Sequence, residues 1–342
     1  MSISPADAPD ALPYRLDTDR RRVLMLRMSA AARTEAAFLD ARGMPAQPEG
    51  AWLSFDAFLS RSAQVSRAQL DWIFHIGHCG STLLARVMEA WSQVGVLREP
   101  LPLRTLATMA TMSAATEDDW QALLRGCSAM WSQPLAPAAR VAIKATSSCN
   151  ALIAPILTFA PGDRAVLLDL PLRAWLATLF KSPDSIRDAT ASAPARWTEL
   201  CTHSGVMGSP PLPTADDAEL CAMGWLAEQA RFGHLAGGPH AEAVLRINFE
   251  DVMASPAQSL AAIARHFGLV MEGVDAALAS PWWSRYSKAG EHVYDDADRR
   301  HDLALAQQRF ATEIARGERW VDAWIAVHPA LTLDAVACRR GK

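Results

Sequence analysis

The hydrophobic pattern from residue 71 onward alternates between short apolar runs and longer amphipathic stretches. Apolar runs of strand length lie at 72–77, 94–100, 140–147, 164–170 and 243–251. Between them, apolar residues recur with the spacing of one helix face, as Leu83, Leu84, Val87, Met88 and Trp91 do. Strands that alternate with helices predict a three-layer α/β fold, in which helices flank a central parallel sheet.

The regions outside this alternation have patterns of their own. Residues 1–70 predict an N-terminal extension that is partly disordered, because residues 1 to about 13 are rich in Pro, Ala and Asp. Residues 71–342 form the predicted α/β domain. Within it, residues 183–240 predict a helical insertion without strands, and the chain from 296 predicts C-terminal amphipathic helices.

Composition narrows the class of protein. Of 342 residues, 50% are hydrophobic and 20% are charged, which is typical of a globular protein with a sizeable core. The net charge of −4 gives no reason to expect nucleic-acid binding. We expect no membrane span, and the six scattered cysteines favour reduced thiols and a cytoplasmic location.

The most informative stretch is "WIFHIGHCGSTLLARVMEAW", in which a strand passes through a glycine turn into a helix. Such a turn presents backbone N–H groups at the positive end of the helix dipole, where they can bind an anion. Gly77 and Gly80 can adopt positive φ, and Ser81 and Thr82 add hydroxyl donors. The lysine of the ATPase signature is absent, since Ser81 stands in its place. From the residues alone, an ordinary strand–helix turn that binds nothing remains equally open.

The loop resembles that of the sulfotransferases that use PAPS (3′-phosphoadenosine 5′-phosphosulfate). Their loop runs approximately Pro, Arg or Lys, Ser, Gly, Thr, Thr or Ser, Leu, Leu after a strand, and here residues 77–84 read "GHCGSTLL". A late family segment close to "RYEDLVADPEATLRRIFEFLGL" is matched by "RINFEDVMASPAQSLAAIARHFGL" at 246–269. The resemblance covers approximately residues 71–269 and implies a P-loop-type α/β fold.

The resemblance also implies roles for two strand-end residues. Glu99 ends the second predicted strand, nineteen residues after Gly80, as in the tyrosylprotein branch, where this Glu is the catalytic base. The third strand of the family commonly carries a lysine, and "VAIKATS" supplies Lys144, which would counter charge on the leaving phosphate. From the residues alone, Glu99 could instead form a surface salt bridge with Arg98 or Arg104.

Three positions depart from the family pattern. His78 stands where family loops carry Arg or Lys beside the glycine. Asp169 and Ala177 replace the Arg and Ser that contact the 3′-phosphate of the donor, and an aspartate that faces a phosphate is repulsive. Recognition of the 3′-phosphate must therefore move elsewhere, or the donor must differ. The candidates to take it over are Arg173, Thr178, Arg285 and Lys288.

Taken as a whole, the resemblance implies a sulfotransferase that moves a sulfuryl group from PAPS to a hydroxyl, or an amine, of a small molecule, saccharide or peptide. Residues 183–240 would form the acceptor lid, and no metal is expected. The expected catalytic residues are Glu99, Lys144 and His78, and the expected donor-binding residues are Gly77, His78, Cys79, Gly80, Ser81, Thr82, Arg173, Thr178, Arg285 and Lys288. A kinase on the same scaffold and a non-catalytic nucleotide-binding protein are the two alternatives. The acceptor and the oligomeric state do not follow from the sequence.

Overall fold

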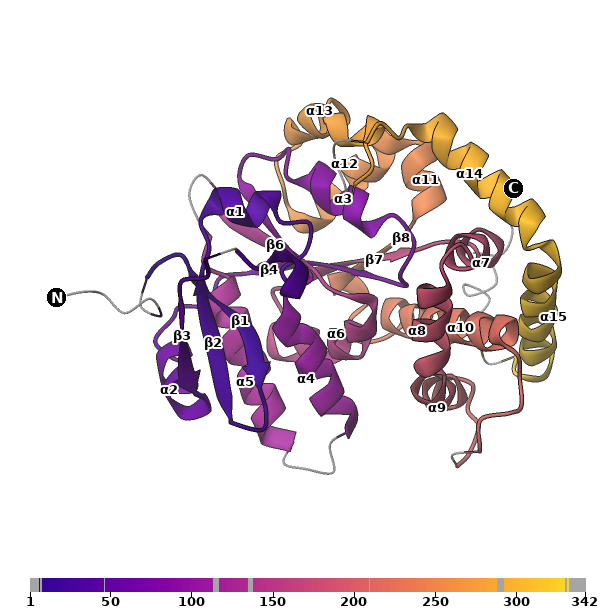
Figure 1. The fold of residues 1–342 in the computed structure, drawn as a ribbon, viewed down its shortest axis with the longest axis horizontal. Coiled ribbons are helices and arrows are strands. Elements are labelled where there is room, and N and C mark those ends of the chain that lie inside the picture. The colour runs from indigo at the N-terminus through magenta and orange to yellow at the C-terminus, as the bar shows by residue number, and fades with distance from the viewer. Residues whose placement is uncertain are drawn as a thin grey trace. The chain divides into compact units, whose positions relative to one another are not determined.

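The computed structural model describes residues 6, 8–45, 47–112, 117–134, 138–208, 210–287, 292–329 and 331. Its main sheet has five strands in the order β5-β6-β4-β7-β8 (Figure 1). The strands are β4 (Leu70–His75), β5 (Val94–Arg98), β6 (Arg140–Lys144), β7 (Arg164–Asp169) and β8 (Val244–Asn248). β6 pairs in parallel with both β4 and β5. The predicted α/β fold, with a central parallel sheet flanked by helices, is confirmed.

Contacts divide the chain into two compact units. Unit 1 comprises Met1–His75, Ser81–Val166 and Ala257–His292, and unit 2 comprises Ile76–Gly80, Leu167–Pro256 and Val293–Lys342.

Several helices, in unit 1 or at its boundary with unit 2, follow strands of the main sheet in the chain. They are α3 (Ser81–Met88), α4 (Leu101–Met112), α5 (Glu117–Trp131), η3 (Ser147–Leu152), α6 (Ile153–Phe159), α12 (Pro256–Phe267), α13 (Gly273–Leu278) and η5 (Pro281–Ser284). α3 contacts β4, β5 and β6 with a face that is buried throughout. α12 begins at Pro256, and proline suits the first helical turn.

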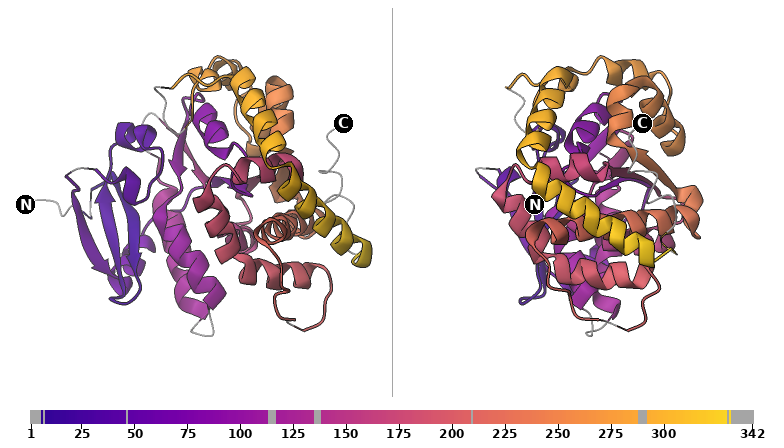
Figure 2. Two further views of the ribbon diagram at one scale, coloured as in Figure 1. Left: turned by 45° about the vertical axis from the view of Figure 1, so that its right-hand side comes forward. Right: turned by 90° about the vertical axis from the view of Figure 1, so that its right-hand side faces the viewer.

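The N-terminal part of unit 1 forms a second, antiparallel sheet. It contains β1 (Ala11–Asp17), β2 (Arg22–Arg27) and β3 (Gly50–Ser54), with α1 (Ala30–Glu35), η2 (Ala41–Gly43) and α2 (Phe55–Ser62). β1 contacts α4 and α5, and the three strands lie beside α5 (Figure 2). Residues 11–13, which the composition favoured as disordered, begin β1, because Ala11 and Leu12 are buried there.

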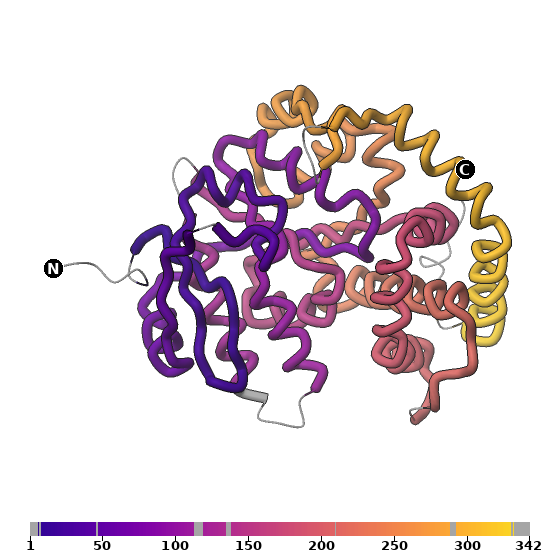
Figure 3. Tube along the Cα trace, viewed as in Figure 1, coloured from indigo at the N-terminus to yellow at the C-terminus, as the bar shows by residue number. Residues whose placement is uncertain are grey.

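Unit 2 is mostly helical. It contains α7 (Leu172–Leu179), α8 (Pro183–Ala191), α9 (Ala193–His203), α10 (Asp217–Gly237), η4 (Ala241–Ala243), α11 (Phe249–Ala254), α14 (Asp296–Arg309) and α15 (Ala311–Val327). α10 packs against α9 and α15 (Figure 3). The prediction that 183–240 contains helices without a strand is confirmed for the described part of that range. The prediction that a strand runs to residue 251 is wrong, because the Asn248 side chain accepts the Glu250 N–H at 2.8 Å and caps α11.

One buried carboxyl in the core of unit 1 makes stability depend on pH. Asp71 in β4 is fully buried, and Arg140 Nη2 donates to its Oδ1 at 2.8 Å, while its Oδ2 has no hydrogen-bond partner among the described residues. Burial raises the pKa of Asp71 to about 7, although Arg140 acts to lower it.

We therefore expect Asp71→Asn to flatten the dependence of stability on pH. The pKa of Asp71 is higher in the folded protein than in the unfolded chain. Its contribution to the free energy of unfolding is therefore complete below about pH 4 and is lost as the pH rises through 7. The loss amounts to about 1 kcal/mol for each pH unit in that window. Urea unfolding at pH 5 and pH 8 measures it, and an unchanged pH dependence in the variant would contradict the assignment.

Candidate functional site

The loop that leaves β4 has an unusual backbone. Between His75, the last residue of β4, and Ser81, the first of α3, three residues have positive φ: Gly77 (81°), His78 (50°) and Gly80 (77°). Glycine adopts this conformation freely, whereas a histidine does so at a cost of about 1 kcal/mol or more. Left-handed residues in a turn make the backbone N–H groups converge into a concave anion site. The loop thus has the backbone conformation of an anion cradle.

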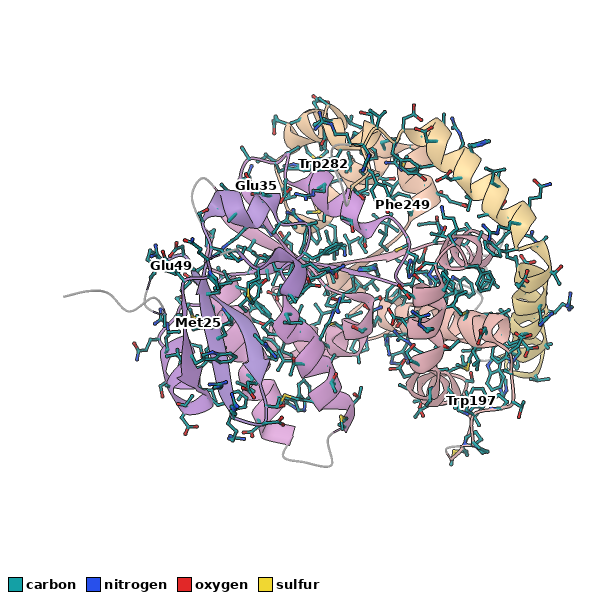
Figure 4. All side chains as sticks on the ribbon, in the orientation of Figure 1. Met25, Glu35, Glu49, Trp197, Phe249 and Trp282 are labelled. Carbon is teal, nitrogen blue, oxygen red and sulfur yellow. The ribbon has the colours of Figure 1, made fainter. Side chains whose placement is uncertain are left out.

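Contacts within unit 2 fix this loop from one side. A Cβ placed on Gly80 would lie 2.2 Å from the ring of Phe249, the first residue of α11 (Figure 4 labels Phe249). The indole Nε1 of Trp175 in α7 donates to Gly77 O at 2.9 Å. Two aromatic side chains therefore hold the backbone of the loop closely.

The side chains of the loop differ in exposure. Cys79 is buried, with its thiol 3.5 Å from Leu168 O, whereas His78 is exposed. Ser81 and Thr82 are buried at the start of α3. Of the two residues at the tip of the loop, His78 presents its side chain to solvent, and Cys79 directs its thiol toward β7.

Within unit 1, a pair of charged residues lies at the carboxyl ends of β5 and β6. The Glu99 N–H donates to Lys144 O at 2.7 Å, and the Lys144 ammonium donates to the Glu99 carboxylate. Lys144 is 1% exposed and Glu99 is 8% exposed. Glu99 has a positive φ of 54°, which a residue with a side chain rarely adopts. Strain of this kind is often found at functional sites.

The register of the sheet explains why these two residues meet. Arg98 pairs with Lys144, and Ile73 in β4 pairs with Lys144 on the other side. The carboxyl ends of β5, β6 and β4 therefore lie at one edge, where ligands bind in open α/β sheets. β4 also ends at this edge, and the glycine loop continues from it.

Hydrogen bonds hold the end of β4 in place. The His75 ring contacts Ala145 O through Nε2 at 2.9 Å, and Asn150 Nδ2 donates to His75 O at 2.9 Å. Asn150 thus bridges η3 to β4, and Thr146 occupies the N-cap position of η3.

Two arginines surround Glu99, and only one of them was a candidate from the sequence. Arg104 Nη2 donates to Glu99 Oε2 at 3.4 Å, as one sequence-based alternative predicted, whereas Arg98 is fully buried and pairs with Glu89. Arg42 Nη2 lies 3.7 Å from Glu99 Oε2. Sequence reasoning missed Arg42, because it belongs to the N-terminal segment, and no local pattern connects that segment to β5.

The predicted replacements for 3′-phosphate binding have partners within the protein. Arg173 Nη2 donates to Glu318 at 2.6 Å, and Thr178 Oγ1 donates to Ala174 O in its own helix at 2.9 Å. Arg285, in unit 1, is exposed. Lys288 lies outside the described residues. Within the described part of the chain, no contact between Arg173 and Thr178 indicates a shared phosphate site.

Asp169 does not stand as an isolated negative charge. It is fully buried, and Arg246 Nε in β8 donates to its Oδ2 at 2.7 Å. Arg246 also donates to Gln229 in α10. The sequence suggested repulsion between Asp169 and a phosphate, but the arginine of the next strand balances this charge. Ala177 is also fully buried.

Neither a metal-ligating cluster nor a membrane-spanning helix occurs in the ranges that the structure describes. Within these ranges, no three or more His, Cys, Asp or Glu side chains gather in a way that could hold a metal ion. In the same part of the chain, no helix combines the length and apolar character needed to cross a membrane.

Comparison with known proteins gives a likeness in structure only. No family model matches this chain, and no curated protein matches its sequence. Among solved structures, the sulfotransferase domain of the Synechococcus PCC 7002 olefin synthase is 16% identical, with a TM-score of 0.40 over 81% of this chain and 94% of that one. The sulfotransferase domain from the curacin biosynthetic pathway is 14% identical, with a TM-score of 0.40 over 75% and 99%. A sulfotransferase from Mycobacterium tuberculosis is 13% identical, with a TM-score of 0.40 over 81% and 84%.

Proposed function

We propose that this chain is a sulfotransferase-like enzyme that transfers a sulfuryl group from PAPS to a hydroxyl, or an amine, of an acceptor. The observation that carries the proposal is the Glu99–Lys144 pair. A carboxylate in a strained backbone position, bound to a buried ammonium at the carboxyl edge of the sheet, would place a proton acceptor and a cation side by side, as sulfuryl transfer requires. The glycine loop, which begins where β4 ends, supplies the anion cradle.

In this proposal Glu99 is the general base and Lys144 responds to it. The acceptor oxygen attacks sulfur, its proton passes to the Glu99 carboxylate, and the bond between sulfur and the bridging oxygen breaks to release PAP, the desulfated donor. Protonation removes the negative charge that holds Lys144, so the ammonium becomes available to neutralise the leaving phosphate. Protonation of Glu99 and the contact of Lys144 with the leaving phosphate are thus coupled.

The loop residues would hold the 5′-phosphosulfate. The N–H groups of residues 77–80, with Ser81 and Thr82 at the start of α3, would donate to its oxygens. His78 is exposed and, as an imidazolium, would add a cation where family loops carry Arg or Lys. We also propose that the helices of 183–240 form the acceptor lid.

A second candidate function is phosphoryl transfer from ATP. It is favoured by Asp169 and Ala177, which are both fully buried, so that neither contacts a 3′-phosphate as the family residues do. Arg285, which is exposed, and Lys288 are the remaining candidates for that contact. A donor without a 3′-phosphate would make the contact unnecessary.

A thermal-shift comparison of PAP, adenosine 5′-phosphosulfate, ATP and GTP tests the donor. We expect PAP to stabilise the protein most, by about 2.7 kcal/mol at a concentration 100 times its Kd. Magnesium-dependent stabilisation by ATP that exceeds that of PAP would select the kinase. Binding of none of the four nucleotides by a folded protein would contradict both enzymes and favour a non-catalytic role.

A further inference from the structure

Two arginines beside Glu99 present their guanidinium groups to solvent. The side chains of Arg42 and Arg104 are 57% and 43% exposed, although both lie within 4 Å of the same carboxylate oxygen, Glu99 Oε2. Their exposure leaves them able to contact a second anion.

Around Glu99, the negative charges are buried and the two arginines are exposed. The side chains of the carboxylates are only 7% exposed for Asp40 and 10% exposed for Glu99, and Lys144 lies behind them at 1%. Together with the two arginines, the group has one more cation than carboxylates. Because the negative charges are covered and the arginines are not, the group presents positive potential to solvent.

Arg42 is held ready in one conformation. Its Nε and Nη2 donate to both oxygens of Asp40, at 2.9 and 2.5 Å, and its guanidinium lies 3.8 Å from the ring centroid of Phe38. These contacts fix the side chain before any ligand arrives, so that binding loses little rotamer entropy. Within the described part of the chain, Nη1 of Arg42 makes no hydrogen bond, and neither does Nη1 of Arg104, whose Nε donates to Thr146 Oγ1 at 3.3 Å.

We propose that the acceptor carries an oxyanion, such as a carboxylate, sulfate or phosphate, close to the hydroxyl that reacts, and that Arg42 and Arg104 bind it. This inference rests on the proposed function, because it takes Glu99 as the base for that hydroxyl. An anion bound by both guanidinium groups lies next to Glu99, so it must belong to a compound whose hydroxyl is only a few bonds away. The class is hydroxy acids, aromatic or saccharide.

Matched acceptor pairs test this proposal. We would measure Kd by calorimetry, and kcat/KM with PAPS, for 4-hydroxyphenylacetate against 2-(4-hydroxyphenyl)ethanol and for glucuronate against glucose. The two pairs separate aromatic from saccharide sources of the anion. We expect the acid of at least one pair to bind and react more strongly than its neutral partner by roughly tenfold to hundredfold. Arg42→Gln and Arg104→Gln should each reduce that preference, taken as the ratio of the values for the acid to those for the neutral partner, by a similar factor.

Controls separate this proposal from its rivals. Arg300→Gln removes a guanidinium that is 73% exposed on α14 and should leave the preference unchanged. Arg42→Lys keeps the charge but loses the planar fork, and should retain part of the preference. Should Arg42→Gln fail to fold, Arg104→Gln alone decides, because the Arg104 guanidinium bonds only to other side chains within the described part of the chain.

Three results would overturn the proposal. The first is equal binding of the acid and the neutral partner in both pairs, and the second is no binding of either acid. The third is a loss of PAP affinity in the arginine variants that is as large as their loss of affinity for the acid. That third result would assign the arginines to the donor. Failure of the proposed function is distinguishable, because it appears as absent PAP binding and absent transfer from PAPS, while the calorimetric preference for the acid is measured without turnover.

Discussion

Replacement of Glu99 by glutamine is expected to lower turnover with PAPS by about 10²–10⁴-fold and to leave PAP affinity largely unchanged. Glutamine has the same shape but cannot accept the proton of the acceptor. The glycine loop, which would bind PAP, makes none of its described contacts through Glu99. Steady-state kinetics with PAPS, with calorimetric titration of PAP on the same preparation, measures both quantities.

The Glu99–Lys144 contact complicates this experiment, because glutamine leaves a buried ammonium beside a neutral group. Removal of one partner of a buried pair costs about 3–5 kcal/mol, although the amide oxygen of glutamine can still accept a hydrogen bond. The double variant Glu99→Gln with Lys144→Met removes the uncompensated charge and should recover part of the lost stability, but not the activity. Glu313→Gln, an exposed site on α15, is the matched control. Full turnover in a folded Glu99→Gln protein would remove this residue from the mechanism.

The strand-end residues could be predicted because they follow from local pattern alone. A parallel sheet brings the carboxyl ends of its strands to one edge, so the pattern places the strand-end residues Glu99 and Lys144 at that edge. Their contact depends in addition on the pairing of β5 with β6, which the pattern does not give. Positive φ at Gly77 and Gly80 follows from the residue type. The positive φ of His78 and Glu99 could not be predicted, since only packing around a residue can hold a side chain there.

Arg42 could not be found because its position depends on distant contacts. Arg98, a suggested partner of Glu99, is fully buried and donates through Nε to Ala36 O at 3.0 Å. The Leu39 N–H donates to Arg98 O at 2.7 Å, which places the segment 36–42 along the end of β5. The first bond joins a side chain to a backbone carbonyl, and the second joins two backbone groups. Both connect residues far apart in the sequence, and neither hydrophobic periodicity nor composition reports them.

Asp169 is a second residue whose partner could not be predicted from the sequence. Its sequence position suggested a negative charge that would repel a phosphate, but Arg246, 77 residues later, donates to it. Pairing between adjacent strands fixed this contact, and a one-dimensional reading cannot distinguish an exposed aspartate from a buried, paired one. The charge that a donor would meet at this point is therefore close to neutral.

Substitution of Gly80 by alanine is expected to be the most disruptive single change in the loop. The residue has φ of 77°, and the added Cβ would lie 2.2 Å from Phe249. A left-handed conformation costs a residue with a side chain about 1–2 kcal/mol, and overpacking typically costs a further 1–3 kcal/mol. We expect a loss of about 2–5 kcal/mol in the free energy of unfolding, with PAP affinity reduced because the N–H groups move.

A double-mutant cycle separates the steric cost at Gly80 from the backbone cost. In the Phe249→Ala background the ring is gone, so Gly80→Ala should retain only the conformational part of its cost, and the two substitutions should be less than additive by about 0.5–3 kcal/mol. Gly224→Ala in α10, where an added Cβ meets no atom within 4 Å, should instead stabilise the protein by about 0.5–1 kcal/mol. Urea unfolding and PAP titration of the four loop proteins measure both effects. Wild-type stability and PAP binding in Gly80→Ala would mean that the left-handed loop and its contact with Phe249 do not form the anion cradle.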